Sequence, residues 1–148
     1  MRHIAVFALS AVILAPANAS AEAYRCIMDR QITVGGNDMF EDNKEANRGT
    51  EFYLSIDNKT QRGTFSTCNQ GGCGNVGEIP VVTRYETEGI QKGTKNLMIR
   101  MITGPPGQLG RLWNLERRGG DRDFTAIAIS AIGQRSDTEL GTCQMIIE

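Results

Sequence analysis

The stretch Glu51-Phe52-Tyr53-Leu54-Ser55-Ile56-Asp57 decides the fold class of this chain, because its side chains alternate between apolar and polar. In an extended strand, one face carries Phe52, Leu54 and Ile56, and the other carries Tyr53, Ser55 and Asp57. Asp57-Asn58-Lys59 is typical of a turn, and 60–66 is expected to return as the second strand of a hairpin. Asn58-Lys59-Thr60 also matches an N-glycosylation sequon, placed where the turn would expose it. This segment therefore predicts half-buried strands packed on a core.

Similar runs, separated by Gly, Asn, Asp and Pro, recur along the rest of the chain. We expect strands at about 24–34, 79–86, 96–103, 111–117, 123–132 and 139–147. The run 123–132 is apolar on both faces, which predicts a central or barrel-lining strand. About eight strands with short links predict an all-β domain, an antiparallel up-and-down barrel whose closure removes exposed edges. A two-sheet β-sandwich is the alternative.

One segment does not fit the β pattern. Asp38-Met39-Phe40-Glu41 has the form of a capping box, and 41–47 is polar and tolerant of helix. Gly49 can end such a helix. We therefore expect a short helix, or an excursion of the chain, between the first two strands. Nothing argues for a second domain, so 22–148 is expected to form one.

Residues 1–21 have the form of a secretory signal peptide, with a positive start, an apolar run over 4–14, and small residues after Pro16. Overlapping cleavage sites end at Ala19, Ala21 or Ala23. Cys26 is not preceded by the Leu-small-small triplet of a bacterial lipoprotein, so we expect no membrane anchor. The pattern predicts a periplasmic or secreted protein.

The charge balance and the lack of histidine narrow the possible functions. The chain has 16 lysines and arginines against 17 acidic residues, and loss of Arg2 with the leader leaves 15 against 17. Without a basic excess, we expect no nucleic-acid partner. Loss of His3 removes Ser-His-Asp, Cys-His and histidine-metal sites. The carboxylates sit in no recognisable motif (Glu86, Glu88, Glu116, Asp121 and Asp123). We therefore expect no catalytic residue, no metal and no cofactor.

Four cysteines in an exported chain predict two disulfides, for which three connectivities are possible. The placement favours a local Cys68–Cys73 bond and a terminal Cys26–Cys143 bond. If Cys26 and Cys143 are bonded, the first and last strands must be neighbours, which a closed barrel satisfies. A zinc site is the competing interpretation, disfavoured by the absence of paired C-x-x-C motifs.

Two segments are candidates for binding. The glycine-rich loop 66–75 carries Asn69 and Gln70 between two cysteines, and is either a rigid binding loop or a long hairpin tip. The second segment runs from Pro105 and Pro106 into the strand that carries Arg111, Trp113 and Arg117. Trp and Arg are enriched at binding hot spots, and alternation places these three side chains on one face. The other interpretation, which we favour, buries Trp113 in the core with the arginines at its rim.

The two ends of the mature chain carry a resemblance. Tyr24-Arg25-Cys26 near the start and Gly141-Thr142-Cys143-Gln144 near the end, with short strands between, resemble small bacterial periplasmic β-barrel proteins. The membrane-bound C-type lysozyme inhibitors are one such family. The resemblance implies an eight-stranded barrel of this size that binds another protein. That family's Ser-Gly-x-x-Tyr motif and Trp-Lys-Gly stretch are absent here, so no inhibitory residue is carried over.

Three functions are consistent with these observations. The first is a non-catalytic module that binds or inhibits an envelope or extracellular protein. The second is a carrier of a small apolar ligand, in a lumen lined by aliphatic and methionine side chains (Leu97, Met98, Ile99 and Met101). The third is a carboxylate-based enzyme. A filled lumen would argue against the carrier, and converging carboxyls with perturbed pKa values would favour the enzyme.

Overall fold

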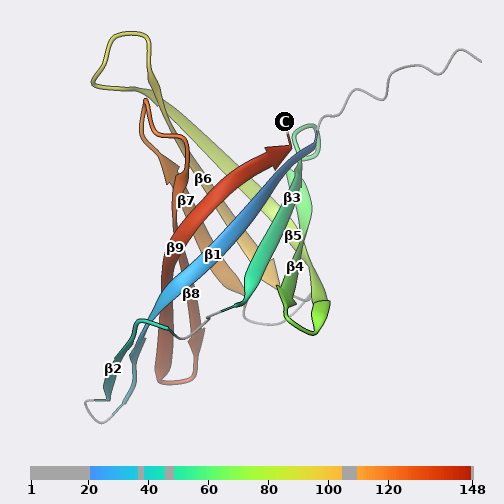
Figure 1. The fold of residues 1–148 in the computed structure, drawn as a ribbon, viewed down its shortest axis with the longest axis vertical. Coiled ribbons are helices and arrows are strands. Elements are labelled where there is room, and N and C mark those ends of the chain that lie inside the picture. The colour runs from blue at the N-terminus through green and yellow to red at the C-terminus, as the bar shows by residue number, and fades with distance from the viewer. Residues whose placement is uncertain (1–20, 37–38, 46–48, 105–109, 148) are drawn as a thin grey trace, which may run out of the picture.

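Nine strands make up the part of the chain that the computed structural model describes, residues 21–36, 39–45, 49–104 and 110–147 (Figure 1). In chain order they are β1 (Ala21–Val34), β2 (Phe40–Asn43), β3 (Glu51–Asp57), β4 (Arg62–Asn69), β5 (Gly72–Glu88), β6 (Lys95–Gly104), β7 (Arg111–Arg117), β8 (Phe124–Ile132) and β9 (Arg135–Ile147). Residues 1–20 of the predicted leader and the Pro105-Pro106 pair lie outside the described residues, whereas Ala21, the last residue of the predicted leader, begins β1. No helix in the described ranges is long and apolar enough to cross a membrane.

All the strands pair antiparallel in the order β2-β1-β3-β4-β5-β6-β7-β8-β9, and β9 pairs back onto β1. Eight strands thus close an up-and-down barrel, as predicted, and β2 is added to the lower half of β1 (Figure 1). The sandwich alternative is wrong, because a single sheet closes on itself. We call the end where Ala21 and Ile147 lie the terminal end, and the other the distal end.

The prediction of a short helix after the first strand is wrong in the described residues. Phe40–Asn43 forms β2, whose residues pair in register with Gln31–Val34 of β1. Asp38, the expected cap, lies outside the described residues. Local propensity is a weak prior, and here the exposed backbone edge of β1 offers ladder hydrogen bonds that outweigh it.

The other strands follow the predicted pattern with different lengths. β3 and β7 have the predicted bounds, whereas β4 extends to Asn69 and β5 begins at Gly72, so these two strands together include most of the glycine-rich loop. That loop is a hairpin tip, because Cys68 pairs with Cys73 and Asn69 pairs with Gly72 across β4 and β5.

The core fills the inside of the barrel. As predicted, Phe52, Leu54 and Ile56 of β3 face inward, while β8 buries Phe124 and its alternate residues. The largest of the inward side chains are fully buried, and Tyr24 meets Phe124 edge-to-face with ring centroids 5.4 Å apart. One cluster joins them all: Tyr24, Cys26, Met28, Phe52, Leu54, Ile56, Ile79, Val82, Leu97, Ile99, Met101, Trp113, Leu115, Phe124, Ala126, Ala128 and Cys143. An eight-stranded barrel is just wide enough for side chains to fill, which supports a solid lumen.

Both predicted disulfides are present, Cys26–Cys143 and Cys68–Cys73. Each joins residues that face each other across a strand pair, and the first ties β1 to β9 where the barrel closes. Gly141 allows the same strands to approach, because a Cβ there would lie 2.0 Å from the carbonyl oxygen of Ile27. Disulfides persist in oxidising surroundings, so these bonds indicate an extracytoplasmic compartment.

Candidate functional site

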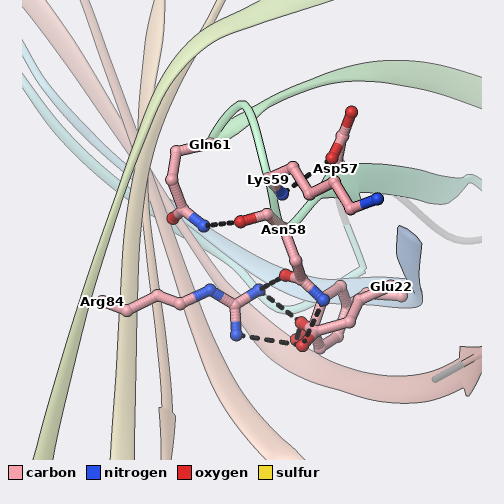
Figure 2. A network of polar contacts seen from close by, with 7 residues as sticks. Glu22, Asp57, Asn58, Lys59, Gln61 and Arg84 are labelled. Carbon is pink, nitrogen blue, oxygen red and sulfur yellow. Dashed lines mark hydrogen bonds and ion pairs between the residues drawn. The ribbon is translucent and has the colours of Figure 1, made fainter. Parts of the chain in front are cut away.

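A polar network closes the terminal end of the barrel (Figure 2). Glu22 of β1 forms a bidentate ion pair with Arg84 of β5, with Arg84 Nη1 3.1 Å from Glu22 Oε1. Because β3 and β4 lie between β1 and β5 in the sheet, this pair bridges the mouth of the barrel. Arg84 Nε is buried and has no hydrogen-bond partner within the described ranges, so the bridge also carries a desolvation cost.

The β3–β4 turn supplies the third member of this network. Asp57 accepts the backbone N–H of Lys59 at 2.8 Å, which forms an Asx turn and orients Asn58. The Asn58 amide accepts from Arg84 at 2.8 Å and donates to Glu22 at 3.1 Å (Figure 2). Asn58 is exposed, as the sequon requires, but its amide nitrogen already serves this bridge.

The charges in this network reinforce each other. Burial alone would raise the pKa of Glu22, but hydrogen bonds from Arg84 and Tyr24 outweigh it, so the pKa of Glu22 is lowered. Burial, together with the hydrogen bond that Tyr24 donates to Glu22, raises the pKa of Tyr24. The mouth therefore holds a carboxylate, a guanidinium and a neutral phenol at neutral pH, an arrangement that holds strands together.

A second polar closure lies at the distal end. Arg111 of β7 pairs with the buried carboxylate of Glu139 at 2.9 Å and lies over the Phe52 ring, 5.4 Å from its centroid. Two residues further along β7, Trp113 donates its indole N–H to the buried hydroxyl of Thr103 at 3.0 Å. Trp113 also packs against Phe52, with ring centroids 5.4 Å apart. Side chains thus close both mouths of the barrel.

The structure separates the residues that the sequence grouped on one face of β7. Trp113 is fully buried, as the favoured interpretation predicted, so its ring is core rather than contact surface. Arg111 lies at the distal end, whereas Arg117 lies near the terminal end, with its guanidinium 5.0 Å from the centroid of the Phe124 ring. Six residues of extended strand span about 20 Å, so the two arginines cannot share one small site.

The loop candidates lie at the distal end. Asn69 and Gln70 occupy the β4–β5 turn and are exposed, and the Asn69 carboxamide accepts the Gly71 N–H at 2.9 Å. The β6–β7 connection opens at the same end, but Pro105 and Pro106 lie outside the described residues. Of the predicted binding residues, the structure therefore places Asn69, Gln70 and Arg111 at one end.

The most prominent surface feature, the β5–β6 hairpin at the terminal end, was not predicted from the sequence (Figure 1). β7 pairs with β6 only as far as Leu97, so the last residues of the hairpin pair only with each other. Ile90 lies in the turn of this hairpin and is fully exposed, at 105% of its reference area. The segment Gly89-Ile90-Gln91-Lys92-Gly93 signals this turn, because two glycines bracket one large apolar residue.

Hydrogen bonds hold this turn in a defined shape. Gly89 donates to the Thr94 carbonyl at 2.8 Å, and Thr94 donates to the Gln91 carbonyl at 3.0 Å. Gly93 has a φ of +84°, which glycine adopts without strain. The β7–β8 turn braces the hairpin, because Gly119 donates to the Asn96 side chain at 2.8 Å. An exposed apolar residue is thus presented on an ordered support.

Ion pairs bind carboxylates to basic side chains in the described part of the chain, among them Arg25–Glu51, Arg30–Asp42, Arg84–Glu22, Lys95–Glu86, Arg111–Glu139, Arg118–Glu116 and Arg135–Asp137. The hydrogen bond from Arg25, followed by that from Tyr53, lowers the pKa of Glu51 to about 2. A general acid needs the opposite shift, so the Glu51 carboxylate is poorly suited to acid catalysis. No group of three potential metal ligands gathers in the described ranges.

Comparison with protein-family models, with curated proteins and with solved structures finds no match for this chain.

Proposed function

We propose that this chain is a small exported protein, periplasmic or secreted, that binds another protein of the envelope or the exterior and has no catalytic activity. The closed mouths and the packed core support recognition from the outside of the barrel. They favour protein binding over the carriage of a small apolar ligand.

One observation carries this proposal: Ile90 is fully exposed in the ordered tip of a hairpin that extends past its neighbouring strand. Exposing an isoleucine to water has a free-energy cost that burial against a partner would recover. Because its own hydrogen bonds already hold the turn, little entropy would be lost on binding. The Ile90 tip is our candidate anchor for a cleft or pocket of the partner.

The resemblance to lysozyme inhibitors makes an envelope hydrolase the first class of partner to test. A narrow projecting hairpin fits a substrate cleft better than it fits a flat surface. The anchor would be Ile90, on a segment that the resemblance does not cover.

Capture from envelope extract with the immobilised mature protein tests the proposal. The Ile90→Asp variant should capture at least tenfold less of the partner protein than wild type, because the substitution would place a charge in the buried centre of the interface. Ile27→Asp places the same charge at an exposed isoleucine on the outer wall of β1, and should capture normally. Equal capture by wild type and Ile90→Asp would refute the hairpin as the binding element.

A further inference from the structure

The edge strand β2 presents unpaired backbone at the distal end, opposite the β5–β6 hairpin (Figure 1). Gln31–Val34 of β1 pair with β9 on one side and with β2 on the other. β2 ends the strand order, so no described strand covers its outer edge. An uncovered edge is a template for pairing with another strand.

The register shows which backbone groups point outward. Gly35 donates its N–H to the Met39 carbonyl at 2.9 Å, so these two residues form a hydrogen-bonded pair. Along an antiparallel ladder, hydrogen-bonded pairs alternate with pairs that are not hydrogen-bonded to each other. Glu41 and Asn43 therefore direct their backbone groups toward β1. Phe40 and Asp42 direct their N–H and C=O groups outward, which gives the edge two donors and two acceptors.

The side chains beside this edge combine apolar surface with negative charge. Phe40 and Val34 face each other across the ladder and are 67% and 49% exposed. Asp42 is already paired with Arg30 at 2.7 Å. Glu41, on the other face of β2, is exposed. Recognition at this edge thus favours an apolar residue beside Phe40 and a cation opposite Glu41.

A second copy of the chain fits this edge poorly. The outward backbone groups of Phe40 in one copy can pair only with those of Asp42 in the other, and this antiparallel register would place each Glu41 opposite the same glutamate of the other copy. Directly opposed like charges destabilise a strand pair. The charge pattern therefore selects a different partner.

We infer that β2 is a docking edge for an extended segment of another protein, in which basic and apolar residues alternate. The segment would add a strand beside β2, with main-chain bonds to Phe40 and Asp42 and a lysine or arginine opposite Glu41. This inference goes beyond the proposed hairpin anchor, and the two surfaces lie at opposite ends of the barrel.

Fluorescence anisotropy with two labelled peptides of about seven residues tests the docking edge. One peptide alternates valine with lysine, and the other alternates valine with glutamate. Wild type should bind the lysine peptide at least tenfold more tightly, and Glu41→Lys should reverse this order. Ile90→Asp should bind the lysine peptide like wild type, which separates this inference from the proposed function.

Proline substitutions identify the edge itself. Asp42→Pro removes an outward N–H and leaves the ladder to β1 intact, so it should abolish binding while the melting temperature stays within a few degrees. Asp42→Ala keeps the N–H and should still bind. If Asp42→Pro fails to fold, the reversal by Glu41→Lys remains the deciding result. Equal binding of both peptides, undiminished binding by a folded Asp42→Pro variant, or dimerisation of wild type through β2 would overturn the inference.

Discussion

Truncation of Trp113 is the sharpest stability test of the packed lumen. Trp113 is fully buried, packs against Phe52 and donates to Thr103. Trp113→Ala removes the largest core side chain and should lower the free energy of unfolding by about 3–5 kcal/mol. At about 3–5 °C per kcal/mol for a domain of this size, the melting temperature should fall by about 10–20 °C.

Trp113→Phe divides this loss into packing and hydrogen bonding. It keeps most of the ring but leaves the hydroxyl of Thr103, itself buried, without its donor. That change should cost about 1–3 kcal/mol. Leu112→Ala is the matched control, since the neighbouring side chain faces outward and is 46% exposed.

We would measure the melting temperature and the free energy of unfolding of all three variants by circular dichroism, during thermal and urea unfolding under non-reducing conditions. The expected order of stability is Leu112→Ala, then Trp113→Phe, then Trp113→Ala. A Trp113→Ala melting temperature within about 2 °C of wild type would refute the packed core, because the lost contacts could not be so weak.

Three further predictions concern charge, disulfides and processing. The folded-state pKa of Glu22 lies below its ordinary value, so its stabilisation is full above pH 4.5 and is lost as the pH falls through the folded pKa. Urea unfolding across that pH range should show the free energy of unfolding falling as the pH falls, and Glu22→Gln should reduce this dependence on pH. Loss of the Cys26–Cys143 disulfide, which joins residues 117 apart in sequence, should lower the free energy of unfolding by about 5 kcal/mol, and loss of Cys68–Cys73 should lower it by about 2 kcal/mol. Urea unfolding of variants in which both cysteines of a pair are replaced by serine measures these losses. Equal losses would contradict the dependence of disulfide stabilisation on loop length. Mass spectrometry should find a mature N-terminus at Ser20 or Glu22, because a start at Tyr24 would delete the carboxylate that pairs with Arg84; a chain beginning at Tyr24 would contradict the role of the terminal mouth.

The alternation of apolar and polar side chains along the strands made the barrel predictable from the sequence. In β3 the period of two places Phe52, Leu54 and Ile56 inside, and the same rule buried Trp113 and separated it from Leu112. The cysteine placement predicted that the first and last barrel strands are neighbours, since that connectivity links the two ends of the chain.

The mouths, the hairpin and β2 were not predictable from local pattern. Glu22 and Arg84 are brought together only by the closure of the barrel, and no period in the sequence records that pairing. β2 is polar and resembles a helix start, and it is a strand because β1 offers an edge. The exposure of Ile90 depends on how far β5 and β6 extend past β7, which is a property of register.

The most direct test of the solid barrel uses its single tryptophan, which lies in the lumen. Titration with long-chain fatty acids and retinoids, followed by Trp113 emission, measures whether an apolar ligand enters the barrel. A packed lumen predicts no saturable change in the intensity or wavelength of Trp113 emission with any of these ligands. A saturable quenching with one ligand per chain would show an accessible lumen, and would contradict recognition from the outer surface alone.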